Sequence, residues 1–222
     1  MLRPIGNALA SSLGRKFVLG ATGLMLVGFL VEHLIGNYKL TPTPLVGGTD
    51  GSEFDAYVDF MNSLGIFKVI GELGLAALFV IHVFLAVRLT MENREARKQR
   101  YECRANHGGK TPASASMFVT GSLILGYLIK HLIDFRFNDA FHEAPAATVV
   151  ETLSDPLNAF IYIAVSFVVG IHLSHGFRSA FQSLGLSHPQ WNPVIEITGK
   201  ALAALFAIAF AWIPIYFLFF NN

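Results

Sequence analysis

Four histidines stand inside long apolar stretches of this 222-residue chain and are its most chemically demanding feature. They are His33 in FLVEHLIGN, His82 in FVIHVFLAV, His131 in GYLIKHLIDF and His172 in VVGIHLSHGF. An imidazole is costly to place in hydrocarbon, so an ionisable side chain inside a membrane span is by default a candidate functional residue. The imidazole nitrogens of histidine bind metals or exchange protons. The depth of each histidine in the membrane and its neighbours decide between these roles.

The elements that must position these histidines are membrane-spanning helices. The chain is 53% hydrophobic and 14% charged, whereas soluble domains average about 25% charged residues. Five stretches reach the ~20 apolar residues that a helix needs to cross a bilayer. They are residues 17–38, 64–87, 116–135, 157–177 and 200–220. None alternates like a barrel strand, so the sequence predicts an all-α integral membrane protein, one five-helix bundle formed by residues 1–222.

The positions of the basic residues predict the orientation of this bundle. If the N-terminus is cytoplasmic, 12 of the 16 lysines and arginines fall on the inner side. The outer side keeps only Lys39, Lys68, Lys130 and Arg136. Because an excess of Lys and Arg marks cytoplasmic segments, the sequence predicts a cytoplasmic N-terminus and an external C-terminus.

The span directions then sort the histidines by depth. A helix rises 1.5 Å per residue, so His33 and His131 lie ~24 and ~22 Å into spans entered from the cytoplasm, in the outer half. The second and fourth spans run the other way, and His82 and His172 lie ~23–27 Å from the outer entry, in the inner half. The four histidines therefore form two layers, each with members on two different helices.

Two histidines at one depth on separate helices are what a bis-imidazole haem b requires, because the axial ligands approach the iron from opposite faces of the ring. Two layers predict two haem b groups, one between His33 and His131 and one between His82 and His172. His175 lies one helical turn from His172 on nearly the same face. It is therefore an alternative for that ligand or a hydrogen-bonding neighbour of it.

Basic residues near the ligands are candidates for binding the haem propionates. Arg88 and Arg178 each follow an inner-layer histidine by six residues, and Lys130 and Arg136 flank the outer-layer His131. The ordinary basic flank of a membrane span explains the same residues about equally well. The matched spacing in two helices favours Arg88 and Arg178 as propionate partners.

Small and acidic residues beside the ligands have two explanations each. Glycines flank three of the histidines, at positions 28, 36, 126, 170 and 176. They would admit a flat ring, but helix crossings use glycine for close packing too. Two acids, Glu32 beside His33 and Glu72, are costly enough in a membrane to suggest a proton or quinone role. Glu72 can instead pair with Lys68 one turn away.

An ordered set of short motifs accompanies the histidines. The first span ends in HL followed by Asn37, spans two and four carry IH, and HGFRSAFQSLGL (residues 175–186) leaves span four. With these motifs the chain resembles, over essentially its whole length, the single-chain dihaem cytochrome b membrane anchor of bacterial succinate dehydrogenases and fumarate reductases. The resemblance implies His33 and His131 as ligands of the distal haem and His82 and His172 as ligands of the proximal haem. Arg178 departs from it, because relatives often carry tryptophan there.

The resemblance implies an electron-transfer subunit that does no succinate chemistry itself. Such a chain lies in the bacterial cytoplasmic (inner) membrane and anchors a flavoprotein subunit and an iron–sulfur subunit on the cytoplasmic side. It passes electrons through the two haems to or from a quinone, most often menaquinone in this family. Ser11, Ser12, Arg15 and Lys16 resemble the serine and basic residue that bind quinone in related anchors. A helix N-cap followed by basic residues explains the same side chains.

Three other classes of membrane protein are alternatives. The cytochrome b anchor of a nitrate reductase or hydrogenase also has paired histidines, but the HL and IH motifs with SAFQSLGL favour the succinate type. A histidine-bearing transporter or proton channel would have broken helices at the bilayer midplane. These spans have no internal proline before Pro214. A membrane metalloenzyme would have several HxxH boxes, and His172 with His175 is the one such pair in the spans.

Overall fold

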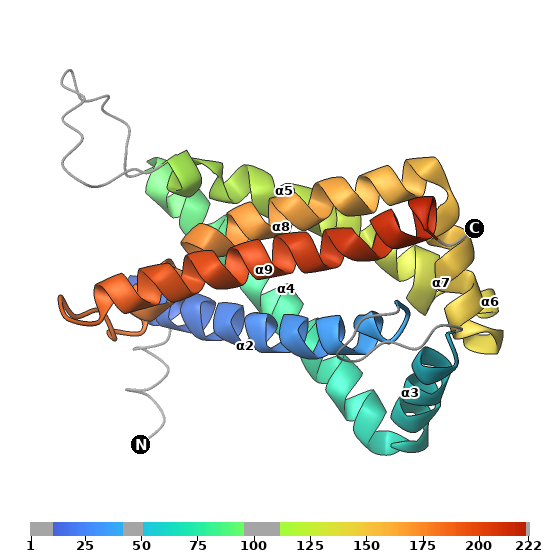
Figure 1. The fold of residues 1–222 in the computed structure, drawn as a ribbon. Helices are drawn as coiled ribbons and strands as arrows, with labels where there is room; N and C mark the ends of the chain where they lie inside the picture. The colour runs from blue at the N-terminus through green and yellow to red at the C-terminus, as the bar shows by residue number, and fades with distance from the viewer. Residues whose placement is uncertain (1–10, 42–50, 96–111, 221–222) are drawn as a thin grey trace.

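A computed structural model of the chain describes residues 11–41, 51–95 and 112–220, and every regular element in these ranges is helical (Figure 1). The long helices are α2 (Ser12–Tyr38), α4 (Ile66–Glu95), α5 (Pro112–His131), α8 (Pro156–Ser183) and α9 (Asn192–Phe219). The π-helical turn η1 (Leu132–Arg136) continues α5. The short helices are α3 (Ser52–Ser63), α6 (Asp139–Glu143) and α7 (Pro145–Ser154).

The prediction of five spans is confirmed, since five of these helices are long and apolar enough to cross a membrane. Three of them extend well beyond the apolar stretch that predicts them. For example, α4 continues to Glu95, through a segment in which Arg88 forms an i,i+4 ion pair with Glu92. The connection between the first two spans contains the short helix α3. The polar segment 96–111, with Cys103 and His107, lies outside the described residues.

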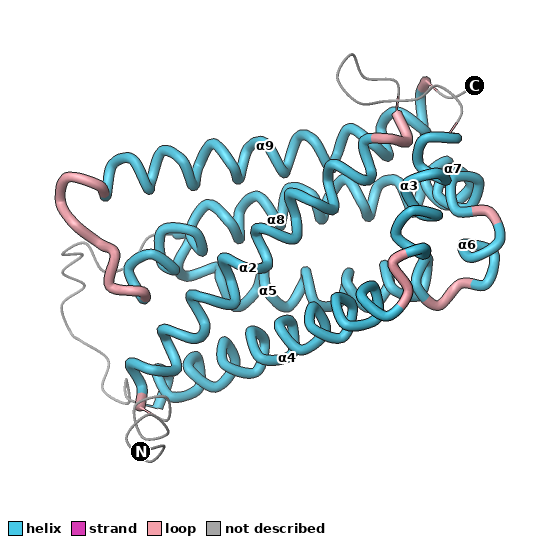
Figure 2. Tube along the Cα trace, turned by 90° about the horizontal axis from the view of Figure 1, so that it is seen from below, coloured by secondary structure: helices cyan, strands magenta, loops and turns pink. Residues whose placement is uncertain are grey.

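Helix α8 is the centre of the bundle, because α2, α5 and α9 all pack on it, while α4 lies against α2 (Figures 1 and 2). Glycines allow the closest crossings. A Cβ atom at Gly170 of α8 would lie 2.8 Å from the Cβ of Ala207 and 3.0 Å from the carbonyl oxygen of Ala203, both on α9. A Cβ at Gly20 of α2 would lie 3.0 Å from the carbonyl oxygen of Ala180 on α8. These small residues let helix backbones approach directly.

The short helices α3, α6 and α7 cover one end of the bundle, where a cluster of buried apolar residues lies. Its buried members come from α3, α7, α8, α9 and η1 and from the end of the first span: Leu40, Phe54, Phe135, Ala146, Val149, Leu153, Tyr162, Ile213 and Phe217. Asp55 of α3 accepts a hydrogen bond from the backbone N–H of Ala146 (2.9 Å) in the first turn of α7. This bond satisfies an amide that has no partner within its own helix and ties the two short helices together.

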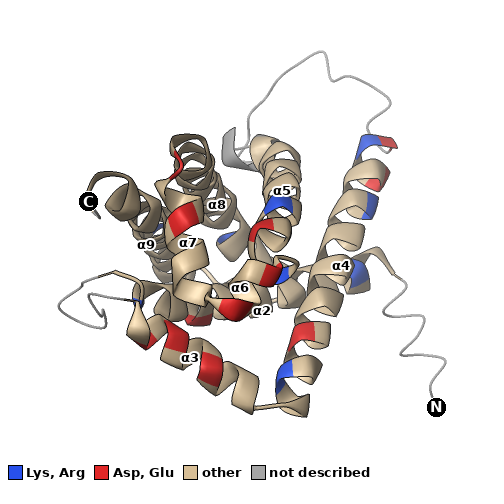
Figure 3. Ribbon diagram, turned by 90° about the vertical axis from the view of Figure 1, so that its right-hand side faces the viewer, with Lys and Arg blue, Asp and Glu red and all other residues tan. Residues whose placement is uncertain are grey.

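The two ends of the bundle carry different charges, and Figure 3 shows the acidic side chains at the end that faces the viewer. We call the end covered by α3, α6 and α7 the acidic end, after Glu53, Asp55, Asp59, Asp139, Glu143, Glu151 and Asp155. We call the other end the basic end, after Arg15, Lys16, Arg88, Arg94, Arg178 and Lys200. The described ends thus have the charge asymmetry that the sequence predicts.

Candidate functional site

The two histidines predicted for the outer layer face one another between α2 and α5, toward the acidic end. The ring centroids of His33 and His131 lie 5.7 Å apart and the ring planes are nearly perpendicular, at 83°. Each ring also lies against an aromatic residue one turn earlier in its own helix: Phe29 stacks on His33 at 5.3 Å, and Tyr127 is tilted over His131 at 5.7 Å. We call His33 and His131 the acidic-end pair.

The acidic-end pair fits a further bound group. The Nδ1 atom of His131 is buried and has no hydrogen-bond partner among the described residues. An unsatisfied buried polar atom costs about 1–3 kcal/mol, so it calls for an explanation. A Cβ atom at Gly28 or Gly126, each five residues before a histidine of the pair, would meet nothing within 4 Å. Open space beside these two glycines, on the helices that carry the pair, leaves room for a flat group, whereas Nδ1 of His131 stays without a partner when a group binds at Nε2.

The two histidines predicted for the inner layer lie toward the basic end, on α4 and α8. His82 and His172 are close enough for their charges to interact. Each ring nitrogen Nδ1 lies against a threonine of another helix: Thr22 Oγ1 is 3.2 Å from His82, and Thr120 Oγ1 is 3.0 Å from His172. We call His82 and His172 the basic-end pair.

The geometry of these contacts indicates which nitrogen of each histidine is protonated. Thr22 Oγ1 donates to the carbonyl of Val18 (2.9 Å), and Thr120 Oγ1 donates to the carbonyl of Ser116 (3.0 Å). A hydroxyl has a single proton, so each oxygen then accepts a hydrogen bond from Nδ1–H of its histidine. In this tautomer, which the threonine contacts favour, Nε2 of both rings is unprotonated and available to a metal.

Glycine follows each of these threonines and lets the imidazole approach the helix. A Cβ at Gly23 would lie 3.3 Å from Cε1 of His82, and one at Gly121 would lie 3.4 Å from Cε1 of His172. The distance at Gly23 is tighter than most real Cβ contacts, and the distance at Gly121 is at the limit of ordinary van der Waals contact. We call Thr22–Gly23 and Thr120–Gly121 the Thr–Gly clasps.

The threonines of the clasps are functional candidates that the sequence reasoning missed. A longer comparison of spans one and three would have found them. Residues 22–35 (TGLMLVGFLVEHLI) and 120–133 (TGSLILGYLIKHLI) are identical at seven positions, including the Thr–Gly dipeptide and the histidine. In each span the threonine precedes the histidine by eleven residues, about three helical turns. Each of the two helices therefore serves both layers, with a clasp at one level and a ligand candidate at the other.

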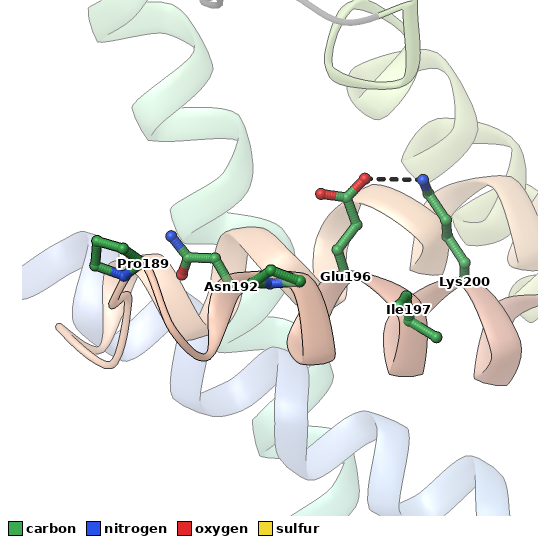
Figure 4. A pocket seen from close by; sticks show the side chains of 6 residues that line it. Pro189, Asn192, Glu196, Ile197 and Lys200 are labelled. Carbon is green, nitrogen blue, oxygen red and sulfur yellow. Dashed lines mark hydrogen bonds and ion pairs between the residues drawn. The ribbon is translucent and has the colours of Figure 1, made fainter.

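The basic residues predicted to bind propionates all have acidic partners in the structure. Arg88 pairs with Glu92 (3.1 Å), Arg178 with Glu196 (3.0 Å) and Lys130 with Asp134 (2.6 Å). Glu196 also accepts from Lys200 (2.8 Å) in a shallow groove at the start of α9 (Figure 4). That these basic side chains bind haem propionates stays a prediction. Such binding requires each of them to share its acidic partner with a propionate or to release it.

The structure favours His172 over His175 as the partner of His82. His172 lies on a Thr–Gly clasp and interacts with the charge of His82. His175 interacts instead with the charge of Arg178, toward the end of the helix. His175 therefore fits the role of a neighbour of the basic-end pair better than that of a ligand.

The residues predicted for quinone binding do not come together in one place. Ser11 is the N-cap of α2 and accepts from the backbone N–H of Gly14 (3.0 Å), which confirms the helix-cap interpretation of this segment. Ser12 and Lys16 are exposed, and Arg15 pairs with Glu92 (2.9 Å) at the basic end. Glu32 lies 20 residues along the same helix from Ser12, toward the acidic end.

At the acidic end, Glu32 accepts a hydrogen bond from the hydroxyl of Tyr57 on α3. The tyrosine ring packs on Gly36, where a Cβ would lie 2.7 Å from its Cε1 atom. Burial and, after it, the hydrogen bond to Glu32 raise the pKa of Tyr57 above its usual value. This contact fixes α3 beside the helix that carries His33.

We expect the Tyr57 contact to make the stability of the protein depend on alkaline pH. The unfolded tyrosine ionises near pH 10, whereas the folded one retains its proton to higher pH. The contribution of Tyr57 is therefore complete below about pH 10 and is lost as the pH rises toward the folded pKa. Thermal unfolding in detergent between pH 8 and pH 11 should show a fall that is smaller in Tyr57→Phe. An identical fall in the variant would contradict this role.

A polar cluster surrounds the first turn after His131. Asp134 of η1 accepts from Lys130 (2.6 Å) and from the hydroxyl of Tyr162 on α8 (2.6 Å). Nearby, Arg136 pairs with Glu72 of α4 (2.9 Å), which also pairs with Lys68 (3.6 Å) as the sequence suggests. The cluster joins η1 to both neighbouring helices.

Asp134→Asn should destabilise the fold by about 1–3 kcal/mol, because the half-buried ammonium of Lys130 loses its counter-charge. The Asp134 side chain is 16% exposed and that of Lys130 is 28% exposed, so solvent screens the pair only partly. Thermal unfolding in detergent measures the loss. Asp59→Asn, an exposed substitution of the same kind on α3, is the control and should change little. Equal stability of the two variants would contradict a structural role for Asp134.

The described residues define a class of protein, a helical multi-pass membrane protein with one pair of facing histidines, His33 and His131, and a second pair, His82 and His172, within electrostatic reach. Among these residues, no group of three or more His, Cys, Asp and Glu side chains is placed to hold a metal ion. No protein-family model matches the chain, and neither a curated protein nor a solved structure matches it.

Proposed function

We propose that the chain is the dihaem cytochrome b anchor subunit of a bacterial succinate dehydrogenase or fumarate reductase, a succinate:quinone oxidoreductase. The observation that carries the proposal is the contact of His33 on α2 with His131 on α5, together with His82 on α4 and His172 on α8 within electrostatic reach. The ordered motifs around them, with HGFRSAFQSLGL after span four, favour this family over other cytochrome b anchors.

In this proposal the acidic-end pair, His33 and His131, holds the distal haem, and the basic-end pair, His82 and His172, holds the proximal haem. The bound haems supply one-electron redox chemistry at two levels of the membrane. The helices orient the four imidazoles and keep water away from them. The clasps present Nε2 of the basic-end pair, and the aromatic residues Phe29 and Tyr127 limit how far the rings of the acidic-end pair turn.

The proposed orientation has the basic end in the cytoplasm and the acidic end outside. The charge asymmetry of the described ends supports it, because Lys and Arg accumulate on the cytoplasmic side. The N-terminus is then cytoplasmic and the C-terminus external. The flavoprotein and iron–sulfur subunits would dock at the basic end, beside the proximal haem, and the chain would exchange electrons with a quinone, menaquinone in our proposal.

Co-purification tests this function. A tag on the full chain, used to isolate it from its native membranes, should bring down a flavoprotein and an iron–sulfur subunit. Succinate or a menaquinol analogue should then reduce the b-type absorbance of the complex. A molybdenum-containing or nickel–iron partner would assign the chain to a nitrate reductase or hydrogenase instead. An isolate with solute or proton transport and no redox partner would contradict the proposal altogether.

A further inference from the structure

We infer that Thr22 and Thr120 are positioning residues of the basic-end pair: their hydroxyls hold Nδ1–H of His82 and His172 and so present Nε2 of both rings to a metal. The inference rests on the proposed function, since it assigns these residues a task at the proximal haem. It goes beyond the ligands themselves, because neither threonine touches the iron.

The evidence begins with the hydroxyl protons. Thr22 has two carbonyl acceptors within its helix, Val18 (2.9 Å) and Leu19 (3.0 Å), and Thr120 has Ser116 (3.0 Å) and Met117 (3.2 Å). Both threonines are only 6% exposed, so no water competes for these protons. With its proton committed to a carbonyl, each oxygen is left as an acceptor that faces an imidazole nitrogen.

Ordinary helix geometry does not explain these contacts. Threonine commonly donates to a carbonyl one turn earlier, and Thr90 does so toward Ala86 (2.7 Å) in α4. The clasps add a histidine from a neighbouring helix at hydrogen-bond distance and a glycine that lets its ring approach. The same arrangement occurs twice, at sites 98 residues apart in the sequence. Because the arrangement occurs at both histidines of the basic-end pair, it favours the same positioning role for both threonines.

The acidic-end pair provides the contrast. Nδ1 of His131 has no hydrogen-bond acceptor in the described part of the chain, and its ring lies among aromatic side chains. A hydrogen bond from Nδ1–H makes Nε2 a more basic ligand, which stabilises the oxidised metal, and its loss typically costs 10–100-fold in metal affinity. The clasps therefore act on the proximal haem alone.

The experiment compares four variants of the full chain in its complex. In Thr22→Val and Thr120→Val, which lack the hydroxyl, the midpoint potential of one b-type component should shift to more positive values and its haem affinity should fall about 10–100-fold. Thr22→Ser retains the hydroxyl and should restore both properties. Thr90→Val removes a hydroxyl that bonds only to its own helix and should leave both components unchanged.

A second measurement reads the histidine protons directly, whether or not haem is bound. In the full chain labelled with ¹⁵N-histidine, side-chain NMR of the diamagnetic, reduced protein reports which ring nitrogen carries the proton. The native chain should show Nδ1–H at His82 and His172. Thr22→Val should change the signal of His82 and not that of His172.

The two measurements separate the possible outcomes. Absence of b-type absorbance with the expected Nδ1–H signals would reject the proposed function and retain the threonine–histidine bonds. Valine variants that equal Thr90→Val in potential, haem affinity and ¹⁵N signals would overturn the inference. If the valine variants do not fold, Thr22→Ser and Thr22→Ala decide, because equal behaviour of these two would show that the hydroxyl has no task.

Discussion

His172→Ala should abolish one of two b-type absorbance components and leave the other at full intensity. The imidazole of His172 is held on the Thr120–Gly121 clasp and interacts with the charge of His82. Alanine offers no ligand atom, so the haem that we propose for the basic-end pair would be lost. The acidic-end pair lies on α2 and α5, so the substitution does not touch it. Reduced-minus-oxidised absorption spectra at low temperature measure the two components separately.

His175→Ala is the matched control, one turn further along the same helix face, and both components should persist in it. His82→Ala should remove the same component as His172→Ala. His33→Ala and His131→Ala should each remove the other component. If His175→Ala removes a component that survives in His172→Ala, the ligand assignment on α8 is wrong.

Gly170→Ala should destabilise the bundle by about 1–3 kcal/mol, the usual cost of overpacking. The new Cβ would lie 2.8 Å from the Cβ of Ala207 and 3.0 Å from a backbone oxygen, so α8 and α9 must separate along their interface. Neither neighbour is a flexible side chain that can turn away. The same helix carries His172, and the change should therefore also weaken haem retention at the basic-end pair. Thermal unfolding of the purified chain in detergent measures the effect.

Gly71→Ala in α4 is the control, because a Cβ at Gly71 meets nothing within 4 Å. Alanine favours helix over glycine by up to about 1 kcal/mol, so this variant should be as stable as the native chain or slightly more so. If Gly170→Ala matches it, α8 and α9 do not approach as closely as described.

The sequence predicts the five spans well, and the reason is geometric. A bilayer fixes the length of a span, and a constant rise per residue converts position into depth. His33 and His131 indeed face one another, and His82 and His172 lie within electrostatic reach. Their role as haem ligands stays a prediction.

The partners of the polar side chains were less predictable. The ion pair of Arg178 with Glu196 joins α8 to α9, and the contact of Thr120 with His172 joins α5 to α8. Such contacts depend on how helices cross, which single-helix periodicity does not specify. A threonine inside an apolar span is also compatible with an ordinary bond to its own helix. The repeat of Thr–Gly eleven residues before a histidine is the sequence signal that distinguishes the clasps.

Haem content tests the central claim most directly. The purified full chain should contain two haem b groups per polypeptide, and its reduced-minus-oxidised spectrum should resolve two b-type components. Each component belongs to one histidine pair. Each single His→Ala variant at positions 33, 82, 131 and 172 should therefore contain one haem b group and show one b-type component. A chain that is folded, yet lacks b-type absorbance and haem, would contradict the account.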